Sequence, residues 1–242
     1  MEIRTFSGIG TVVALIASLG GAWADTAVAA GPNVLEPGIK HYGKSYNDLT
    51  GDWWQWVTQF PLATNPILEN GTLDCTRGQS GKIWFIAGNF GGAFGEANPA
   101  HRSCTIPSGK ALFFPLANSL FWVPEDGATA AAVRTAANAG MNAISGLEVM
   151  IDGVAVADPF AYRAQTQPGG FALTFAPLLA DFGFSAQPDP RKPAVADGYW
   201  ILLAPLHNGE HTIRFRASAV NFALDVTYGI TVKGNADGLN SE

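Results

Sequence analysis

The chain has 242 residues and a formal net charge of −6 at pH 7, with 14 basic side chains against 20 acidic ones. The basic residues form no block, so the sequence excludes an electrostatic footprint for nucleic acid or other polyanions. Hydrophobic residues make up 48% of the chain, and no polar linker or run of charge divides it. This composition predicts one β-rich domain with a sizeable core.

The first residues have the pattern of a secretory leader. Arg4 precedes a short apolar run over residues 9–19, and Ala22-Trp23-Ala24 fits the small-x-small rule of signal peptidase. The run is shorter than the roughly 20 residues that a membrane span needs. We therefore predict a signal peptide over residues 1–24 and a single β-sandwich domain over residues 25–242. The mature protein is expected to be secreted or periplasmic, without a membrane span.

Residues 45–60 predict the first helix, which Ser45 or Asn47 would cap and Pro61 would end. Its apolar residues recur about every 3.6 positions and share one face: Tyr46, Leu49, Trp53, Trp56, Val57 and Phe60. Trp54 does not lie on that face. An indole outside the buried stripe exposes apolar area unless another element, a partner or a ligand covers it.

The rest of the chain is mostly strand. Apolar runs at residues 82–87 and 111–116 predict buried strands, and the alanine-rich segment 129–144 predicts a second helix. Further strand patterns follow at residues 147–151, 154–157, 163–167, 171–175, 199–206, 211–217 and 222–232. Short turns predict hairpins within the first two pairs and a meander of the last three strands. We expect a mainly β fold, an antiparallel β-sandwich or jelly roll with two packed helices, at about 45–60 and 129–144.

Cys75 and Cys104 both lie in the exported part, where an even number of cysteines predicts one disulfide. Closing a loop of about 30 residues contributes roughly 3 to 4 kcal/mol to stability. Five polar residues lie close to one or the other cysteine: Asp74, Arg77, Gln79, His101 and Arg102. The bridge would gather them into a site for a polar or carboxylate-bearing ligand. The alternative is that Asp74 only pairs with Arg77 or Arg102 and holds the loop.

Two of the four histidines, His207 and His211, lie four positions apart. The intervening Asn208-Gly209 predicts a type I′ turn, which would make them partners in a hairpin. Strand alternation would then send the two imidazoles to opposite faces of the sheet, away from any shared metal ion. Structural hydrogen bonding is therefore favoured over a metal site for both rings.

Asp197 comes directly before Gly198-Tyr199-Trp200 at the start of a predicted strand. A carboxylate, a phenol and an indole in this order could line a groove. A glycosidase needs two carboxyl groups at a defined separation across the scissile bond, and one acidic position does not define such a pair.

Several strings resemble a family of secreted bacterial single-domain proteins. They are Asp52–Val57, which contains WWQW, then Cys75–Gly88, Arg102–Pro107, Asp197–Trp200 and Gly209–Ile213. Together these strings are spread over most of the mature chain. The resemblance implies export and a single domain, and it implies no activity.

The leading hypothesis is a secreted protein that recognises carbohydrate or polysaccharide, with sugars stacked on aromatic rings. The predicted ligand-binding residues are Trp54, Arg77, Gln79, Trp84, Arg102 and Tyr199. One alternative is a polysaccharide lyase or glycoside hydrolase with His101 or Asp197 as catalytic acid or base. The other is a non-catalytic structural protein of the envelope in which the aromatic residues are core. We expect no metal or other cofactor and no nucleic acid.

Overall fold

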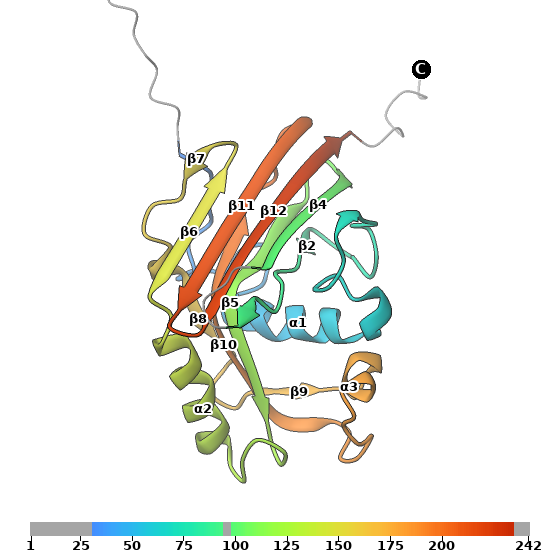
Figure 1. The fold of residues 1–242 in the computed structure, drawn as a ribbon, viewed down its shortest axis with the longest axis vertical. Helices are drawn as coiled ribbons and strands as arrows, with labels where there is room; N and C mark the ends of the chain where they lie inside the picture. The colour runs from blue at the N-terminus through green and yellow to red at the C-terminus, as the bar shows by residue number, and fades with distance from the viewer. Residues whose placement is uncertain (1–30, 94–97, 235–242) are drawn as a thin grey trace, which may run out of the picture. The chain divides into compact units, whose positions relative to one another are not determined.

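The computed structural model describes residues 31–93 and 98–234. The predicted signal peptide, residues 1–24, lies outside the described residues. Within them the fold is mainly β, with two sheets packed face to face and helices against them (Figure 1). This confirms the predicted fold class.

The larger sheet has the strand order β1-β4-β12-β11-β6-β7, with β3 beside β12. Its strands are β1 Gly71–Thr72, β3 Gly92–Ala93, β4 Asn98–Pro107, β6 Gly146–Ile151, β7 Val154–Ala155, β11 Gly209–Ala219 and β12 Phe222–Lys233. Figure 1 shows β6, β11, β12 and β4 side by side. Most pairs are antiparallel, but β4 runs parallel to both β12 and β1.

The smaller sheet has the order β2-β5-β10-β8, with β9 also paired to β10. Its strands are β2 Ile83–Phe85, β5 Ala111–Trp122, β8 Arg163–Gln165, β9 Phe171–Leu173 and β10 Arg191–Leu203. The long antiparallel pair of β5 and β10 forms its centre, and β2 runs parallel to β5.

The helices flank these sheets. The α-helices are α1 Tyr46–Thr58, α2 Ala130–Asn142 and α3 Pro177–Asp181, and the 3-10 turns are η1 Leu62–Thr64 and η2 Pro159–Tyr162. The first two confirm the predicted helices. Val133 and Ala137 of α2 pack on Val195 of β10, and the apolar face of α1 packs on the smaller sheet.

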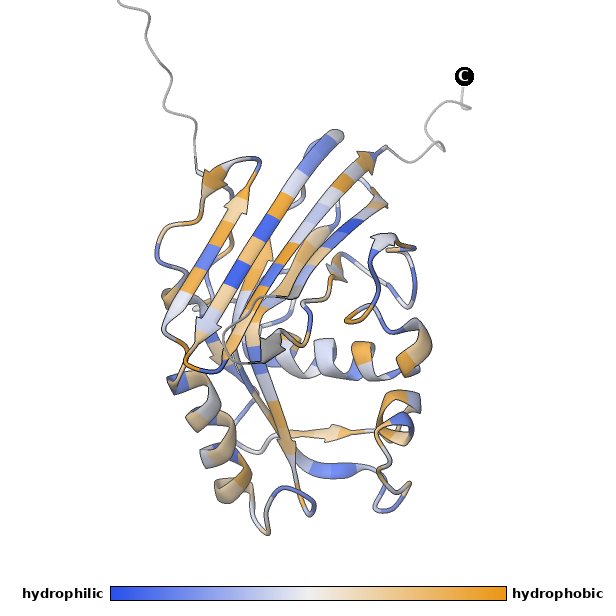
Figure 2. Ribbon diagram, in the orientation of Figure 1, coloured by the Kyte–Doolittle hydropathy of each residue, from blue (hydrophilic) through white to orange (hydrophobic). Residues whose placement is uncertain are grey.

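Two cores meet on β5 and β10. Phe114 and Ile201 point into the sandwich and pack with Phe215 of β11, whereas the neighbouring Phe113 and Trp200 point the other way, against α1. Both faces of these strands are therefore buried, which explains their continuous apolar sequence. In contrast β11 and β12 alternate between hydrophilic and hydrophobic residues, as expected for strands with one solvated face (Figure 2).

Local pairing was predicted better than distant pairing. The hairpins β6–β7 and β11–β12 are confirmed. The predicted hairpin of 163–167 with 171–175 is wrong, because β8 and β9 each pair with β10. The predicted meander is also wrong, because β10 belongs to the smaller sheet while β11 and β12 belong to the larger one. The segment between β10 and β11 crosses from one sheet to the other.

Candidate functional site

Helix α1 positions the candidate site. Ser45 and Asp48 form a capping box in which Asp48 N donates to Ser45 Oγ at 3.2 Å and Ser45 N donates to Asp48 Oδ2 at 3.0 Å. The hydrogen bonds from Ser45 hold the pKa of Asp48 below its ordinary value, so this carboxylate is charged at neutral pH. The helix thus begins at a fixed residue, and this fixes which side chains face outward.

The inward face of α1 is locked by aromatic packing. Trp53 Nε1 donates to the carbonyl oxygen of Ile86 at 3.0 Å, and its ring lies 5.6 Å from that of Trp200. Trp200 in turn stacks on Phe113 with ring centroids 5.1 Å apart. Such pairs stabilise beyond their buried area. The polar face of the helix is therefore held outward.

The polar face of α1 is the floor of two adjoining hollows of about 490 and 570 Å³. They share Lys44, Asp52 and Gln55, so together they form one groove across the helix. One wall is the segment 78–85 and the other is the segment 166–172. We call this the α1 groove; its main lining residues are Tyr42, Lys44, Asn47, Asp48, Gly51, Asp52, Gln55, Gln59, Ser80, Lys82, Gln167 and Phe171.

The described lining of the groove contains one lightly engaged carboxylate, Asp52, and two amide groups with exposed hydrogen bonds, whereas Asp48 is engaged by the helix cap. Asp52 Oδ2 lies 2.9 Å from Lys44 Nζ in an exposed ion pair. Gln55 Oε1 accepts from Thr174 N at 3.3 Å, and Gln167 Nε2 donates to Asp48 at 3.4 Å. Exposed pairs of this kind contribute little to stability. These groups are therefore available to hydrogen-bond a ligand.

A glycine in the middle of α1 shapes the groove floor. Gly51 is buried, and a Cβ atom at this position would come within 3.3 Å of the Phe171 ring. The missing side chain lets the ring lie directly on the helix. Glycine disfavours the helix interior by about 1 kcal/mol relative to alanine, so close packing offsets a local cost here.

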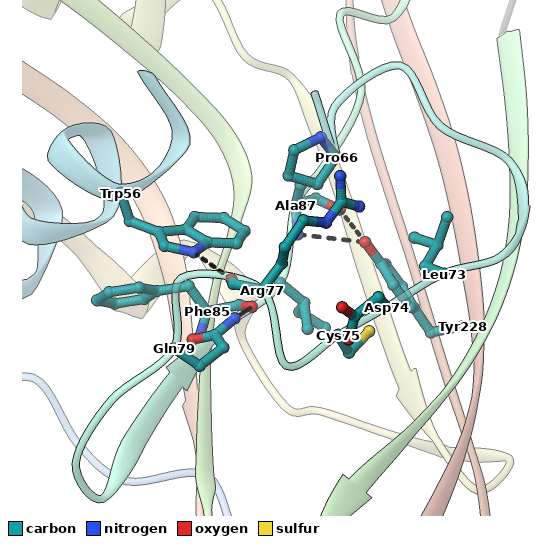
Figure 3. A pocket seen from close by; sticks show the side chains of 11 residues that line it. Trp56, Pro66, Leu73, Asp74, Cys75, Arg77, Gln79, Phe85, Ala87 and Tyr228 are labelled. Carbon is teal, nitrogen blue, oxygen red and sulfur yellow. Dashed lines mark hydrogen bonds between the residues drawn. The ribbon is translucent and has the colours of Figure 1, made fainter. Parts of the chain in front are cut away.

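The predicted disulfide between Cys75 and Cys104 is present, with the Cα atoms 5.8 Å apart. The polar side chains near it are turned to internal hydrogen bonds (Figure 3). Gln79 brackets the backbone of Phe85, donating to its oxygen at 2.7 Å and accepting from its nitrogen at 2.9 Å. Trp56 Nε1 donates to Arg77 O at 3.1 Å. These bonds fix the 78–85 wall of the α1 groove against the helix.

Asp74 and Arg77 line one small cavity of about 20 Å³ beside the bridge, together with Gln79 (Figure 3), but each charged group is already bonded within the fold. The Arg77 guanidinium pairs with Glu69, and Asp74 accepts from Thr76 N and Oγ1 at 3.0 and 2.6 Å. Asp74 therefore holds the loop as a local turn partner, without the predicted pairing to an arginine. His101 is exposed on β4, on the other side of the bridge. The bridge thus brings Asp74, Arg77 and Gln79 to one small cavity but leaves His101 outside its lining.

Arg102 is buried, with 4% of its surface exposed. Its donors reach the carbonyl oxygens of Ile67, Glu69, Ala87 and Gly88 at 2.7 to 3.0 Å and the Tyr228 hydroxyl at 2.7 Å. A guanidinium so enclosed ties loops to the larger sheet and has no free fork for a carboxylate.

Asp197 is fully buried on β10. Arg163 binds both of its oxygens, at 3.1 Å to Oδ1 and 2.6 Å to Oδ2, and Gln165 Nε2 donates to Oδ2 at 3.1 Å. Asn138, with its amide turned to donate, reaches Oδ2 at 3.1 Å. The hydrogen bond to Asp197 raises the pKa of Arg163 further above its ordinary value. We call these four residues the Asp197 cluster.

The other predicted ligand residues are mostly packed. Tyr199 is buried beneath Arg163 and lies edge-on to Phe160 at 5.3 Å. Trp84 is buried beneath Lys110, whose Nζ lies 5.3 Å from the ring centroid. Trp54 is half-buried and lies edge-on to its neighbour Trp53 at 5.1 Å. Arg77 and Gln79 therefore share the small cavity beside the bridge, whereas Trp54, Trp84 and Tyr199 lie apart from it.

The prediction that His207 and His211 point to opposite faces is wrong. Their ring centroids lie 4.3 Å apart, because β11 begins only at Gly209 and His207 lies in the crossing segment. Both nitrogens of His211 are engaged, by Asp152 Oδ2 at 2.7 Å and His207 O at 2.9 Å. No group of three or more His, Cys, Asp and Glu within residues 31–93 and 98–234 is placed to hold a metal ion.

The groove residues Asp52 and Gln55 were missed as ligand contacts. The available signal was polar spacing: Asp48, Asp52 and Gln55 recur at helical intervals opposite the apolar stripe. Because such a pattern is also that of any solvated helix face, it does not identify a groove without the two walls.

No helix in the described part of the chain is long and apolar enough to cross a membrane. A disulfide is typical of proteins in oxidising compartments outside the cytosol. Comparison with protein-family models, curated protein sequences and solved structures finds no match. The candidate function therefore follows from the geometry of the α1 groove.

Proposed function

We propose that this protein is exported and recognises carbohydrate in the α1 groove. The observation that carries the proposal is the composition of the groove, in which the lightly engaged carboxylate of Asp52 and the amides of Gln55 and Gln167 line a long hollow beside aromatic rings. Sugar hydroxyls both donate and accept hydrogen bonds, and carboxylates and amides match them. Tyr42, 49% exposed, and Phe171 supply apolar surface for the faces of sugar rings.

The groove favours recognition over hydrolysis. Its two carboxylates, Asp48 and Asp52, project from one turn of one helix, and Asp48 is engaged by its own cap. The described side chains of the facing walls supply Lys82 and Gln167 but no carboxylate. Glycosidases flank the scissile bond with two carboxyl groups, so this arrangement supports binding without cleavage.

The proposal is tested with the secreted chain, residues 25–242, and a panel of neutral and uronate-containing polysaccharides. Affinity electrophoresis is expected to show retardation by at least one of them. Asp52→Asn and Tyr42→Ala are each expected to weaken binding about tenfold, the loss of one charge-assisted hydrogen bond or one stacked ring. Asp158→Asn, outside the groove, is the matched control for Asp52→Asn and should bind like the wild type.

Two results count against the proposal. If Asp52→Asn and Tyr42→Ala both bind like the wild type, the α1 groove is not the binding site. If no polysaccharide retards the protein, it does not recognise carbohydrate. Mass spectrometry of the incubated polysaccharides is the companion measurement. Released oligosaccharides would replace recognition by the enzyme alternative, with unsaturated ends indicating a lyase.

A further inference from the structure

A second hollow, separate from the α1 groove, lies beneath Trp54. It has a volume of about 120 Å³ and is bounded by α1, the segment 88–90, β5 and β12. None of its lining residues lines the groove. Its walls are mainly apolar, with Ile67, Leu116 and Phe222 among them. This hollow is distinct from the proposed carbohydrate site.

Two hydrogen-bond donors on the walls of this hollow have no partner. Trp54 Nε1 and Asn118 Nδ2 are both buried and bonded to nothing in the described part of the chain. Buried donors are normally satisfied, and leaving one unpaired is costly. Because both donors line the same cavity, we expect a molecule bound in that cavity to accept hydrogen bonds from them.

The other indoles provide a comparison within the chain. The indole nitrogens of Trp53, Trp56 and Trp200 donate to backbone carbonyl oxygens at 3.0 to 3.2 Å. The indoles of Trp84 and Trp122 also lack partners, but neither lines this hollow. Among the tryptophans that the structure describes, Trp54 alone combines an unpaired indole with this cavity, so Trp84 offers a matched control.

The chemistry of the hollow defines its occupant. The described residues of the lining include no charged side chain, so an ionic ligand would lose its hydration without compensation from them. The volume is somewhat below that of a cavity of about 150 Å³ that accommodates benzene. The occupant therefore has about five or six non-hydrogen atoms, an apolar body and acceptor oxygen directed at the two donors.

We propose that this hollow binds a small neutral molecule with one or two acceptor oxygens, such as a cyclic ketone or a lactone. The oxygen accepts from Trp54 Nε1 and Asn118 Nδ2, and the ring contacts the apolar walls. The site would function as a receptor for a small uncharged compound, independently of polysaccharide binding on the other side of α1.

The test is titration of the ¹⁵N-labelled secreted chain with cyclopentanone, followed on the indole N–H resonances. The Trp54 signal is expected to shift saturably, with a dissociation constant in the millimolar range, while the Trp84 signal stays in place. Cyclopentane, which lacks the oxygen, is expected to leave the Trp54 signal unshifted. Asn118→Leu is expected to weaken cyclopentanone binding about tenfold, as followed on the Trp54 signal, and Trp84→Phe is not.

Three outcomes overturn the proposal. An unshifted Trp54 signal with cyclopentanone would mean that only water occupies the hollow. Equal shifts of the Trp54 signal with cyclopentane would show that the two donors do not contribute to binding. Equal weakening by Trp84→Phe would show that loss of any indole weakens binding. Because the wild-type titrations with the two ring compounds need no variant, the proposal stays testable if a substitution impairs folding.

Discussion

The α1 groove and the Asp197 cluster both present a carboxylate near aromatic rings, but the two carboxylates are used differently. Asp197 is fully buried, and Arg163 and Gln165 occupy its oxygens. The Asp52 side chain is 40% exposed and pairs, among the residues that the structure describes, with exposed Lys44. A carboxylate whose oxygens are bonded within the fold holds elements together, whereas one left open can bind a ligand. Saturation of hydrogen bonds, more than residue type, separates a structural site from a binding site.

Removing the disulfide is expected to have the largest effect on stability, and it tests how the wall of the α1 groove is held. Replacing both cysteines, Cys75→Ala with Cys104→Ala, is expected to lower the free energy of unfolding by about 3 to 4 kcal/mol, because the unfolded chain gains loop entropy. Urea denaturation of the wild type and the double variant measures this loss in the free energy of unfolding. The 78–85 wall follows Cys75 directly, so polysaccharide affinity should fall as well. Unchanged stability in the double variant would show that hydrogen bonds alone hold this loop.

Asp197→Asn tests the other region. Removing the charge leaves Arg163 without its carboxylate in a mostly buried setting, and we expect a loss of about 3 kcal/mol in the free energy of unfolding. The measurement is again urea denaturation, with polysaccharide binding measured at temperatures where the variant is folded. Binding should be retained. A variant that is stable but no longer binds would break the comparison and make Asp197 a ligand contact.

A third carboxylate, Asp152, lies between these extremes, because it is 42% exposed but pairs with buried His211. Burial alone would lower the pKa of His211, but hydrogen bonds to Asp152 and His207 O outweigh it and raise the pKa above its ordinary value. Burial would likewise raise the pKa of Asp152, and bonds from His211 and Thr212 lower it instead.

The pair is therefore expected to stabilise the fold over a defined pH range. Its contribution from His211 is complete below about pH 6.5 and is lost as the pH rises through the folded pKa; the contribution from Asp152 is lost below about pH 4. We expect a decrease of less than about 1 kcal/mol in the free energy of unfolding between pH 6 and pH 9, given the exposure of Asp152. His211→Gln should flatten this slope, and His101→Gln should not. An unchanged slope in His211→Gln would assign the pH dependence elsewhere.

The smallest effect on stability is expected in the groove itself. Gln55→Ala should change the free energy of unfolding by less than about 0.5 kcal/mol, because the one hydrogen bond of its side chain with a described residue, accepted from Thr174 N, is exposed. Polysaccharide affinity should nevertheless fall. Thermal denaturation and affinity electrophoresis measure the two quantities on the same sample. A large loss of stability would show that Gln55, like Asp197, holds the fold together, and the α1 groove would then not differ from the Asp197 cluster in this respect.

The sequence predicted elements whose signals are local. The period of apolar residues and a cap at Ser45 or Asn47 predicted α1, whose cap is Ser45, and Asp152-Gly153 predicted the β6–β7 hairpin, because each signal lies within a few residues. β4 was missed, since its residues are largely polar and its partner β12 is more than 100 residues away and parallel. Asn208-Gly209 resembled a two-residue turn, but the chain changes sheets there.

The candidate site was harder to predict for the same reason. Tryptophan and arginine were predicted as ligand contacts because they are large or charged. In the fold, however, Trp84 is packed beneath Lys110, and Arg102 is buried and hydrogen-bonds to backbone oxygens. The groove forms only where α1 meets the segments 78–85 and 166–172, which are separated by about 80 residues of chain. No local sequence pattern can predict a groove between segments so far apart in the chain.

The sharing of β5 and β10 between two cores has a consequence for cooperativity. Phe113 and Trp200 support α1 from one side of these strands while Phe114 and Ile201 close the sandwich from the other. Detaching α1 would expose the same backbone that the sandwich needs, so partial opening of the groove has no low-energy route of its own. The proposed binding surface and the whole fold therefore gain and lose order together, and a ligand held by α1 would slow the global opening of the molecule.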